Sequence, residues 1–168
     1  RRVDAEAGAE RRAVLPGGGA AGSPGVADGE HVDGGESSQG PDEAEVAVVG
    51  MGRVGTGAYN KVREIGRKVV GLDSDLGKVE RHLREGRRVV YADAEDPLLW
   101  HRLRLDAIQV IILALPDTEA KILASEQLRK RGYQGLISAT YVWPEERELL
   151  LAAGADVAYN YFAEAGVG

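Results

Sequence analysis

The chain has 168 residues, 43% of them apolar, a length that holds one hydrophobic core with an appendage but not two full domains. No run of about 18 consecutive apolar residues occurs, so we expect no membrane span within it. The net charge is −6 and the sequence pI is near 5.2, and without a basic stripe we do not expect nucleic-acid binding. The absence of cysteine excludes disulfides and thiolate metal sites. No metal site is predicted, because His31, His82 and His101 have no partner at metal-ligand spacing.

Residues 1–43 are predicted to be a disordered, acidic, glycine-rich linker. They contain nine acidic and four basic side chains, ten of the 23 glycines and no aromatic residue. Such a composition cannot bury enough apolar surface to offset the loss of chain entropy on folding. A docking or inhibitory tail is the alternative for this segment. The predicted folded domain, residues 44–168, carries only −1 of the net charge and is nearly neutral.

Beyond residue 44, short apolar runs rich in valine and isoleucine alternate with segments of helical periodicity, which is typical of a parallel α/β sheet. We predict strands at Glu45–Val49, Lys68–Leu72, Arg88–Tyr91, Ala107–Leu113, Gly135–Ala139 and Asp156–Ala158. The helices between them are expected to turn one apolar face to the sheet, formed by Val54, Ala58, Val62 and Ile65 in the first and by Leu76, Val79 and Leu83 in the second. Asp96 and Pro97 predict the N-cap and first residue of the third helix. Six strands and five crossover helices predict a single doubly wound, Rossmann-type α/β domain with strand order 3-2-1-4-5-6.

A glycine loop with the spacing G-x-G-x-x-G follows the first predicted strand directly. The spacing alone is a weak signal, but an apolar strand before it and a helix-periodic segment after it are the setting that a dinucleotide-binding loop requires. Gly50 permits the tight turn, Gly52 lets a pyrophosphate approach the backbone, and Gly55 lets the helix pack close to the sheet. N–H groups at the helix start would then bind phosphates. The predicted phosphate site is Gly50, Met51, Gly52, Arg53, Val54 and Gly55, with a glycine turn that binds nothing as the alternative.

An acidic residue ends the second predicted strand. Asp73 comes 18 residues after Gly55, where a carboxylate can accept hydrogen bonds from both ribose hydroxyls and would repel a 2′-phosphate. This favours NAD or an adenine nucleotide over NADP, unless one of three nearby basic residues compensates: Arg67, Lys68 or Lys78. Ser74 is included in the predicted site, although it and Asp75 can equally cap the next helix, and capping is also the alternative for Asp73.

Three further positions complete the predicted site. Asp93 and Ala94 follow the third strand beside the expected adenine pocket, and a simple turn explains them nearly as well. Ala114 closes the fourth strand at the switch point between strands 1 and 4, where open α/β sheets bind their ligands. The start of a helix at Pro116 and Asp117 is a sufficient alternative for this position.

These residues together resemble the TrkA-N, or RCK/KTN, domain, and the Kef-type potassium efflux systems look most similar. The likeness covers about residues 45–162 and is carried by Val48–Gly55, including Arg53, by Gly71–Asp75 and by Tyr91–Ala94. It implies a dimeric regulatory domain at the cytoplasmic face of the cell membrane that binds NAD(H), or AMP, ADP or ATP. Binding would gate a potassium or other cation channel, or a cation/proton antiporter, without chemistry on the ligand.

The resemblance also implies roles for individual residues. The loop glycines would hold the phosphates, Asp73 the ribose, and Asp93 with Ala94 the adenine. Arg53 would contact a phosphate or a partner subunit, and a solvated residue at the helix start is its alternative.

The sequence departs from Kef-type domains in one respect, and two other functions are alternatives to a regulatory domain. Kef-type domains carry basic residues just after the fifth strand, whereas the segment 138–143 has none, which puts any regulatory contact made there in doubt. The family's C-terminal subdomain is expected either to be absent or to lie beyond Gly168, and a membrane-embedded subunit is expected upstream of Arg1 in the same chain. The alternative function is the cofactor-binding half of an NAD-dependent oxidoreductase, for which the sequence shows neither a substrate domain nor a proton donor. A ligand-free Rossmann domain acting as an assembly module is the third.

Overall fold

The computed structural model describes residues 44–162, in which strands and helices alternate. The strands are β1 (Val46–Val49), β2 (Val69–Asp73), β3 (Val89–Tyr91), β4 (Val110–Leu113), β5 (Leu136–Tyr141) and β6 (Val157–Asn160). The helices are α1 (Arg53–Glu64), α2 (Leu76–Arg84), α3 (Leu99–Arg102), α4 (Thr118–Lys130) and α5 (Pro144–Ala152). The predicted linker, residues 1–43, lies outside the described residues. Between residues 44 and 162, no helix is long and apolar enough to cross a membrane.

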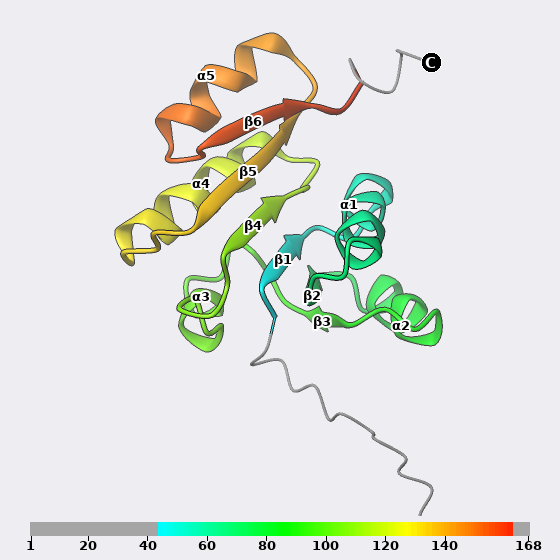
Figure 1. Ribbon diagram of the computed structural model, residues 1–168. Coiled ribbons are helices and arrows are strands. Elements are labelled where there is room, and N and C mark those ends of the chain that lie inside the picture. The colour runs from blue at the N-terminus through cyan, green and yellow to red at the C-terminus, as the bar shows by residue number, and fades with distance from the viewer. Residues whose placement is uncertain (1–43, 163–168) are drawn as a thin grey trace, which may run out of the picture. The chain divides into compact units, whose positions relative to one another are not determined.

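All the strands are parallel and form one sheet in the order β3-β2-β1-β4-β5-β6 (Figure 1). Alternate residues of β1 face opposite sides. Val46 and Val48 pack with α1 and α2, whereas Ala47 and Val49 pack with α3, α4 and α5. Both faces of the sheet are therefore covered by helices, which explains why the strands read as continuous apolar runs. The predicted doubly wound, Rossmann-type fold and its strand order are confirmed.

Three strands differ from the prediction by two or more residues at one end: β4, β5 and β6. The strand β4 begins at Val110 rather than at Ala107, because the Ala107 N–H donates to the Arg104 carbonyl within a turn. The strands β5 and β6 run two residues further than predicted, to Tyr141 and Asn160, where they continue to pair with each other.

The third helix is shorter than predicted and begins later. It starts at Leu99, and its predicted cap, Asp96, instead accepts the Leu98 N–H at 2.9 Å in the turn ahead of it. Pro97 therefore lies in that turn and not at the first helical position, and α3 is a single turn.

The buried faces of α1 and α2 are rotated from the predicted ones. The largest side chain that α1 buries is Tyr59, whose hydroxyl accepts the Arg88 N–H at 2.8 Å, and α2 buries His82 beside Val79. Three residues that the periodicity places on the inner faces are more than half exposed: Ile65, Leu76 and Leu83. An aromatic side chain whose polar atom finds a partner can be buried in place of an aliphatic one, and apolar periodicity does not register that exchange.

Candidate functional site

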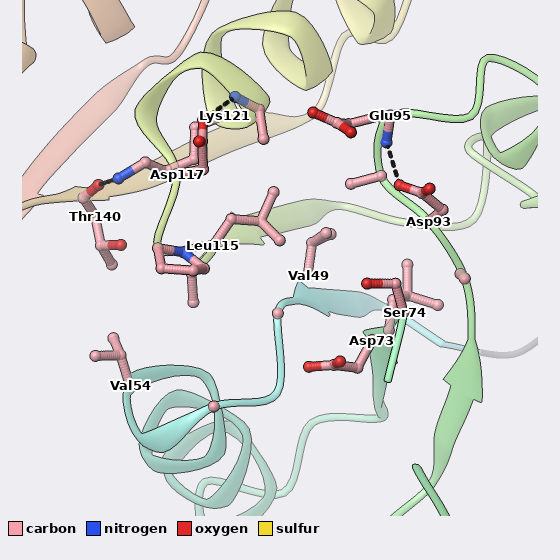
Figure 2. Close-up of a pocket in the computed structure, with 18 of the residues that line it drawn as sticks. Val49, Val54, Asp73, Ser74, Asp93, Glu95, Leu115, Asp117, Lys121 and Thr140 are labelled. Carbon is pink, nitrogen blue, oxygen red and sulfur yellow. Dashed lines mark hydrogen bonds between the residues drawn. The ribbon is translucent and has the colours of Figure 1, made fainter. Parts of the chain in front are cut away.

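A pocket of about 630 Å³ lies at the carboxyl ends of the strands, across the point between β1 and β4 where the winding reverses (Figure 2). Its volume falls within the range of roughly 300–1,000 Å³ that is usual for small-molecule sites. Nine of the eleven predicted site residues line it: Gly50, Gly52, Arg53, Val54, Asp73, Ser74, Asp93, Ala94 and Ala114. The other two, Met51 and Gly55, are buried behind the loop.

Each loop glycine meets a different steric requirement. Gly50 has φ +92°, and a Cβ there would lie 2.9 Å from the Ala114 carbonyl oxygen. A Cβ on Gly55 would lie 1.7 Å from the Gly50 carbonyl oxygen, so only glycine lets α1 approach the loop this closely. A Cβ on Gly52 would meet no atom within 4 Å. Gly50 and Gly55 are thus required by the fold, whereas Gly52 leaves open space on the pocket side of the loop.

The start of α1 is suited to bind an anion. Gly52 is its N-cap and offers no side chain, whereas α2 and α4 are capped by the carboxylates of Asp75 and Asp117. Within residues 44–162 the first N–H groups of α1 therefore have no side-chain capping partner, and they carry the positive end of the helix dipole. Arg53, exposed at the first helical position, adds a positive charge where a helix normally prefers a negative one. This combination attracts a negatively charged group.

Met51 supports the loop from behind. Its side chain is fully buried and packs over Gly71 of β2, where a Cβ would lie 2.6 Å from the Met51 sulfur. Its N–H donates to Asp73 Oδ2 at 2.7 Å, and its carbonyl lies 2.9 Å from His82 Nε2. Met51 therefore positions the loop, and its side chain does not line the pocket.

His82, for which no metal partner was predicted, makes a specific buried contact in the structure. It is 3% exposed, and its Nδ1 lies 3.1 Å from a guanidinium nitrogen of Arg87. Because a guanidinium can only donate, Nδ1 accepts, and Nε2 carries the proton that it donates to the Met51 carbonyl. The glycine loop is thus tied to α2 through the His82 imidazole.

Asp73, the last residue of β2, is 7% exposed and lines the pocket. Its two carboxylate oxygens accept the N–H groups of Met51 and Asp75, at 2.7 and 2.9 Å. Each carboxylate oxygen can accept more than one hydrogen bond, so capacity for a ligand hydroxyl remains. The Lys78 ammonium lies 3.8 Å from Asp73 Oδ2 and also lines the pocket. Of the three basic residues considered as compensating charges, only Lys78 lines the pocket, while Arg67 pairs with Glu45 at the opposite edge of the sheet.

The turn after β3 forms the wall next to Asp73. Asp93 is exposed, and its Oδ1 accepts the Glu95 N–H at 2.9 Å, while Ala94 is buried. This hydrogen bond is that of an ordinary Asx turn, so the simple-turn explanation accounts for the local conformation. The same turn nevertheless lines the pocket. Glu95, which was not among the predicted site residues, contributes a second carboxylate there.

Apart from Ala114, the other half of the pocket was not predicted from the sequence. It is formed by the end of β4, the start of α4 and the end of β5, with Asp117, Lys121 and Thr140 among the lining residues (Figure 2). Lys121 is 2% exposed, and its ammonium donates to the Thr140 carbonyl at 2.6 Å. A signal for it exists in the sequence, because Lys121 occupies the same helical stripe as Ala124 and Leu128, at i+3 and i+7.

Two carboxylates near Lys121 shape its electrostatics. Burial lowers the pKa of the Lys121 ammonium, and the charges of Glu146 and Asp117 partly oppose that shift. Hydrogen bonds from the Thr118 hydroxyl and from the Trp143 N–H lower the pKa of Glu146 to about 2, so this carboxylate is ionised at neutral pH. Through these hydrogen bonds, the Glu146 carboxylate connects the start of α4 to the start of α5.

No three His, Asp or Glu side chains gather in residues 44–162 in a way that could hold a metal ion. The polar groups that line the pocket are instead backbone N–H groups, carboxylates and ammonium groups. These are groups that bind phosphates and hydroxyls.

The family model of the TrkA-N domain matches residues 46–161. The chain belongs to this family. A curated relative, described as the uncharacterized protein MG323 homolog of Mycoplasma pneumoniae, is 25% identical over 95 residues. The match covers 56% of this chain and 41% of the relative, so the chain spans about two fifths of that protein's length.

Solved structures share the fold of this TrkA-N domain. The NAD(P)-binding domain of an exopolyphosphatase-related protein from Archaeoglobus fulgidus aligns with a TM-score of 0.66 at 23% identity, covering 73% of this chain and 91% of that one. The GsuK channel bound to NAD aligns with a TM-score of 0.62 at 24% identity, covering 70% of this chain and 21% of that one. The Kef C-terminal domain of Shewanella denitrificans in its AMP-bound form aligns at 0.62 and 19%, covering 73% of each chain. The likeness to TrkA-N and RCK domains, expected from Val48–Gly55, Gly71–Asp75 and Tyr91–Ala94 together, is confirmed.

Proposed function

We propose that this TrkA-N domain is a nucleotide-sensing regulatory domain. It binds NAD(H) or an adenine nucleotide and gates a potassium or other cation channel, or a cation/proton antiporter, without chemistry on the ligand. The ligand acts by binding more tightly to one state of the assembly than to the other, since only a difference in affinity shifts such an equilibrium.

The observation that carries the proposal is the start of α1 facing Asp73 across one pocket. The helix start supplies uncapped N–H groups and Arg53 for phosphates, and open space at Gly52 lets phosphates approach the backbone. Asp73 supplies the acceptor for ribose hydroxyls at the end of the next strand. A nucleotide carries phosphates next to a ribose, so it would use both of these groups within the one pocket.

Two of the structures that share the fold are described as bound to NAD and to AMP, and both descriptions name a channel or a Kef protein. They support a ligand of this chemical class and a partner in the membrane. We propose accordingly that the domain acts as a homodimer at the cytoplasmic face of a membrane and that its transport subunit is encoded upstream in the same chain. Apolar segments of about 20 residues ahead of Arg1 would support the upstream subunit, and a soluble catalytic domain there would overturn it.

A thermal-unfolding screen with NADH, NAD⁺, NADPH, AMP and ATP tests the proposal. A ligand present at 100 times its dissociation constant stabilises the folded state by roughly 2.7 kcal/mol, which is readily measured. We expect stabilisation by NADH or an adenine nucleotide, and a weaker effect of NADPH because Asp73 repels its 2′-phosphate. No stabilisation by any of the five would overturn the proposed function.

A further inference from the structure

A buried histidine behind the glycine loop holds one peptide group of that loop. His82 lies on the inner face of α2, three residues after Val79, where an aliphatic side chain would pack without any polar atom to satisfy. It is not among the described residues that line the pocket. Burying an imidazole is costly unless its nitrogens have hydrogen-bond partners, and both nitrogens have one. These two partners show what the residue does.

The first nitrogen fixes the direction of the peptide group between Met51 and Gly52. Nε2 of His82 donates to the Met51 carbonyl at 2.9 Å. The Thr56 hydroxyl, at 3.3 Å, is a second and longer donor to the same carbonyl. A trans peptide group is planar, and its C=O and N–H point in opposite directions. Because the carbonyl points at His82, the Gly52 N–H points away from it.

The Gly52 N–H is available to a ligand. Gly52 lines the pocket, and a Cβ at this residue would meet no atom within 4 Å. Within residues 44–162 its N–H has no hydrogen-bond acceptor, whereas the preceding N–H, that of Met51, donates to Asp73 Oδ2 at 2.7 Å. The N–H and the carbonyl of Met51 are thus both held by neighbouring elements, and the next N–H along the chain is left for the pocket.

The second nitrogen of His82 fixes the orientation of the ring. Its Nδ1 accepts from the Arg87 guanidinium at 3.1 Å, and Arg87 Nε donates to Asn60 Oδ1 on α1, also at 3.1 Å. Glu85 accepts a further hydrogen bond from the same guanidinium. An imidazole that is hydrogen-bonded through both nitrogens cannot turn without losing both contacts. The contacts of Arg87 therefore hold the ring that in turn holds Met51.

We propose that His82 is a positioning residue of the nucleotide site: it holds the Met51–Gly52 peptide so that the Gly52 N–H meets a phosphate group of the ligand. This inference rests on the proposed function. A donor that is oriented before binding loses less conformational freedom when the ligand arrives. The resulting gain in affinity falls on the ligand's phosphate, and not on its adenine or ribose. His82 itself contacts no ligand atom and acts through the loop.

Calorimetric titration of the full chain with NADH, in the wild type and in two variants of His82, tests this role. In His82→Leu the side chain fills the core without a donor, and we expect NADH to bind about tenfold more weakly, which is the effect of misaligning one charge-assisted hydrogen bond. In His82→Gln the side-chain amide offers an N–H to the Met51 carbonyl and an oxygen to Arg87. We therefore expect an affinity within about threefold of the wild type.

Val79→Ala is the matched control for a loss of stability. Val79 is buried on the same face of α2 and has no polar side-chain atom, so its truncation destabilises the fold but leaves the donor to the Met51 carbonyl in place. We expect its NADH affinity to stay within about twofold of the wild type, because a cavity in the core does not turn the loop peptide.

A comparison of AMP with adenosine tests whether the effect of His82 falls on the phosphate, because these ligands differ only in that group. Both are titrated into the ¹⁵N-labelled wild type and into His82→Leu, and binding is followed by amide chemical shifts. We expect the affinity for AMP to fall about tenfold in the variant, and the affinity for adenosine to stay within about twofold.

Wild-type NADH affinity in His82→Leu would overturn the inference, as would an affinity of His82→Gln as low as that of His82→Leu. Equal losses of AMP and adenosine affinity would also overturn it, because a general loosening of the fold lowers both alike. A wild type that binds no nucleotide would overturn the proposed function itself. Nucleotide binding that is indifferent to His82 would overturn only the role assigned to this residue.

Discussion

Replacing Gly52 by alanine should weaken nucleotide binding and leave the stability of the fold nearly unchanged, whereas replacing Gly55 by alanine should lower that stability. A Cβ at Gly52 meets no atom within 4 Å, and the residue has φ −73°, which alanine adopts without strain. Alanine is a poorer N-cap than glycine by up to about 1 kcal/mol. Alanine also reduces the conformational entropy of the unfolded chain relative to glycine, which stabilises the folded state by about 0.4–1 kcal/mol. We expect the free energy of unfolding of Gly52→Ala to stay within about 1 kcal/mol of the wild type.

The same methyl group projects into the space where we place the ligand's phosphates. Displacing a phosphate from one backbone N–H removes a charge-assisted hydrogen bond of about 1.5–3 kcal/mol, which weakens binding roughly tenfold to a hundredfold. Gly55→Ala behaves differently, because its Cβ would lie 1.7 Å from the Gly50 carbonyl oxygen. We expect it to lose at least about 3 kcal/mol of unfolding free energy, since backbone atoms must move.

Urea denaturation and calorimetric titration with NADH measure the two effects. Unchanged NADH affinity in Gly52→Ala would refute the placement of the phosphates beside this residue. A loss of more than about 2 kcal/mol of stability in the same variant would refute the claim that the space there is open. A Gly55→Ala variant as stable as the wild type would contradict the close approach of α1 to the loop.

Three further predictions concern the surroundings of the loop. Asp73→Ser removes the charge that opposes a 2′-phosphate while leaving Lys78 in the pocket, so the ratio of NADPH to NADH affinity should rise about tenfold in calorimetric titrations, and a fall would contradict this role. His82→Leu leaves the buried Met51 carbonyl without its main donor and should lower the free energy of unfolding by about 1–3 kcal/mol, whereas Leu83→Ala, at an exposed neighbouring position, should change it by less than about 0.5 kcal/mol. Glu146, with its pKa lowered to about 2, stabilises the fold above the unfolded-state pKa near 4.5, and this contribution is lost as the pH falls towards 2. Glu146→Gln should therefore flatten the dependence of stability on pH between 4.5 and 2, and an unchanged slope would show that the hydrogen bonds to Glu146 do not form.

The strand order and the place of the pocket followed from local signals. Apolar runs buried on both faces, punctuated by glycines, identify parallel strands, and a glycine loop directly after the first strand locates the edge of the sheet at which ligands bind. Gly50 and Gly55 were identified from spacing because their roles are steric and purely local. Gly52 differs from these two glycines, because no protein atom lies within 4 Å of the position that its Cβ would occupy. Its proposed function therefore depends on a ligand and not on packing within the protein.

Burial of residues with polar atoms could not be predicted in the same way. Tyr59 and His82 replace aliphatic residues on the inner faces of α1 and α2 because partners distant in sequence, Arg88 and Met51, satisfy their polar atoms. Lys121 was missed for the same reason, since lysine is normally exposed and the carbonyl that receives its ammonium belongs to another strand. Periodicity detects apolar stripes, and these three contacts depend on the tertiary structure.

The most direct test of a nucleotide site at the glycine loop is a titration of the ¹⁵N-labelled protein with NADH, followed by amide chemical shifts. We predict that the N–H resonances of Gly52, Arg53, Val54 and Asp73 move in proportion to bound ligand. Resonances of Tyr133 and Gly135, which line a second cavity at the amino ends of β4 and β5, should stay in place. No shifts at saturating NADH, or shifts confined to that second cavity, would contradict the site.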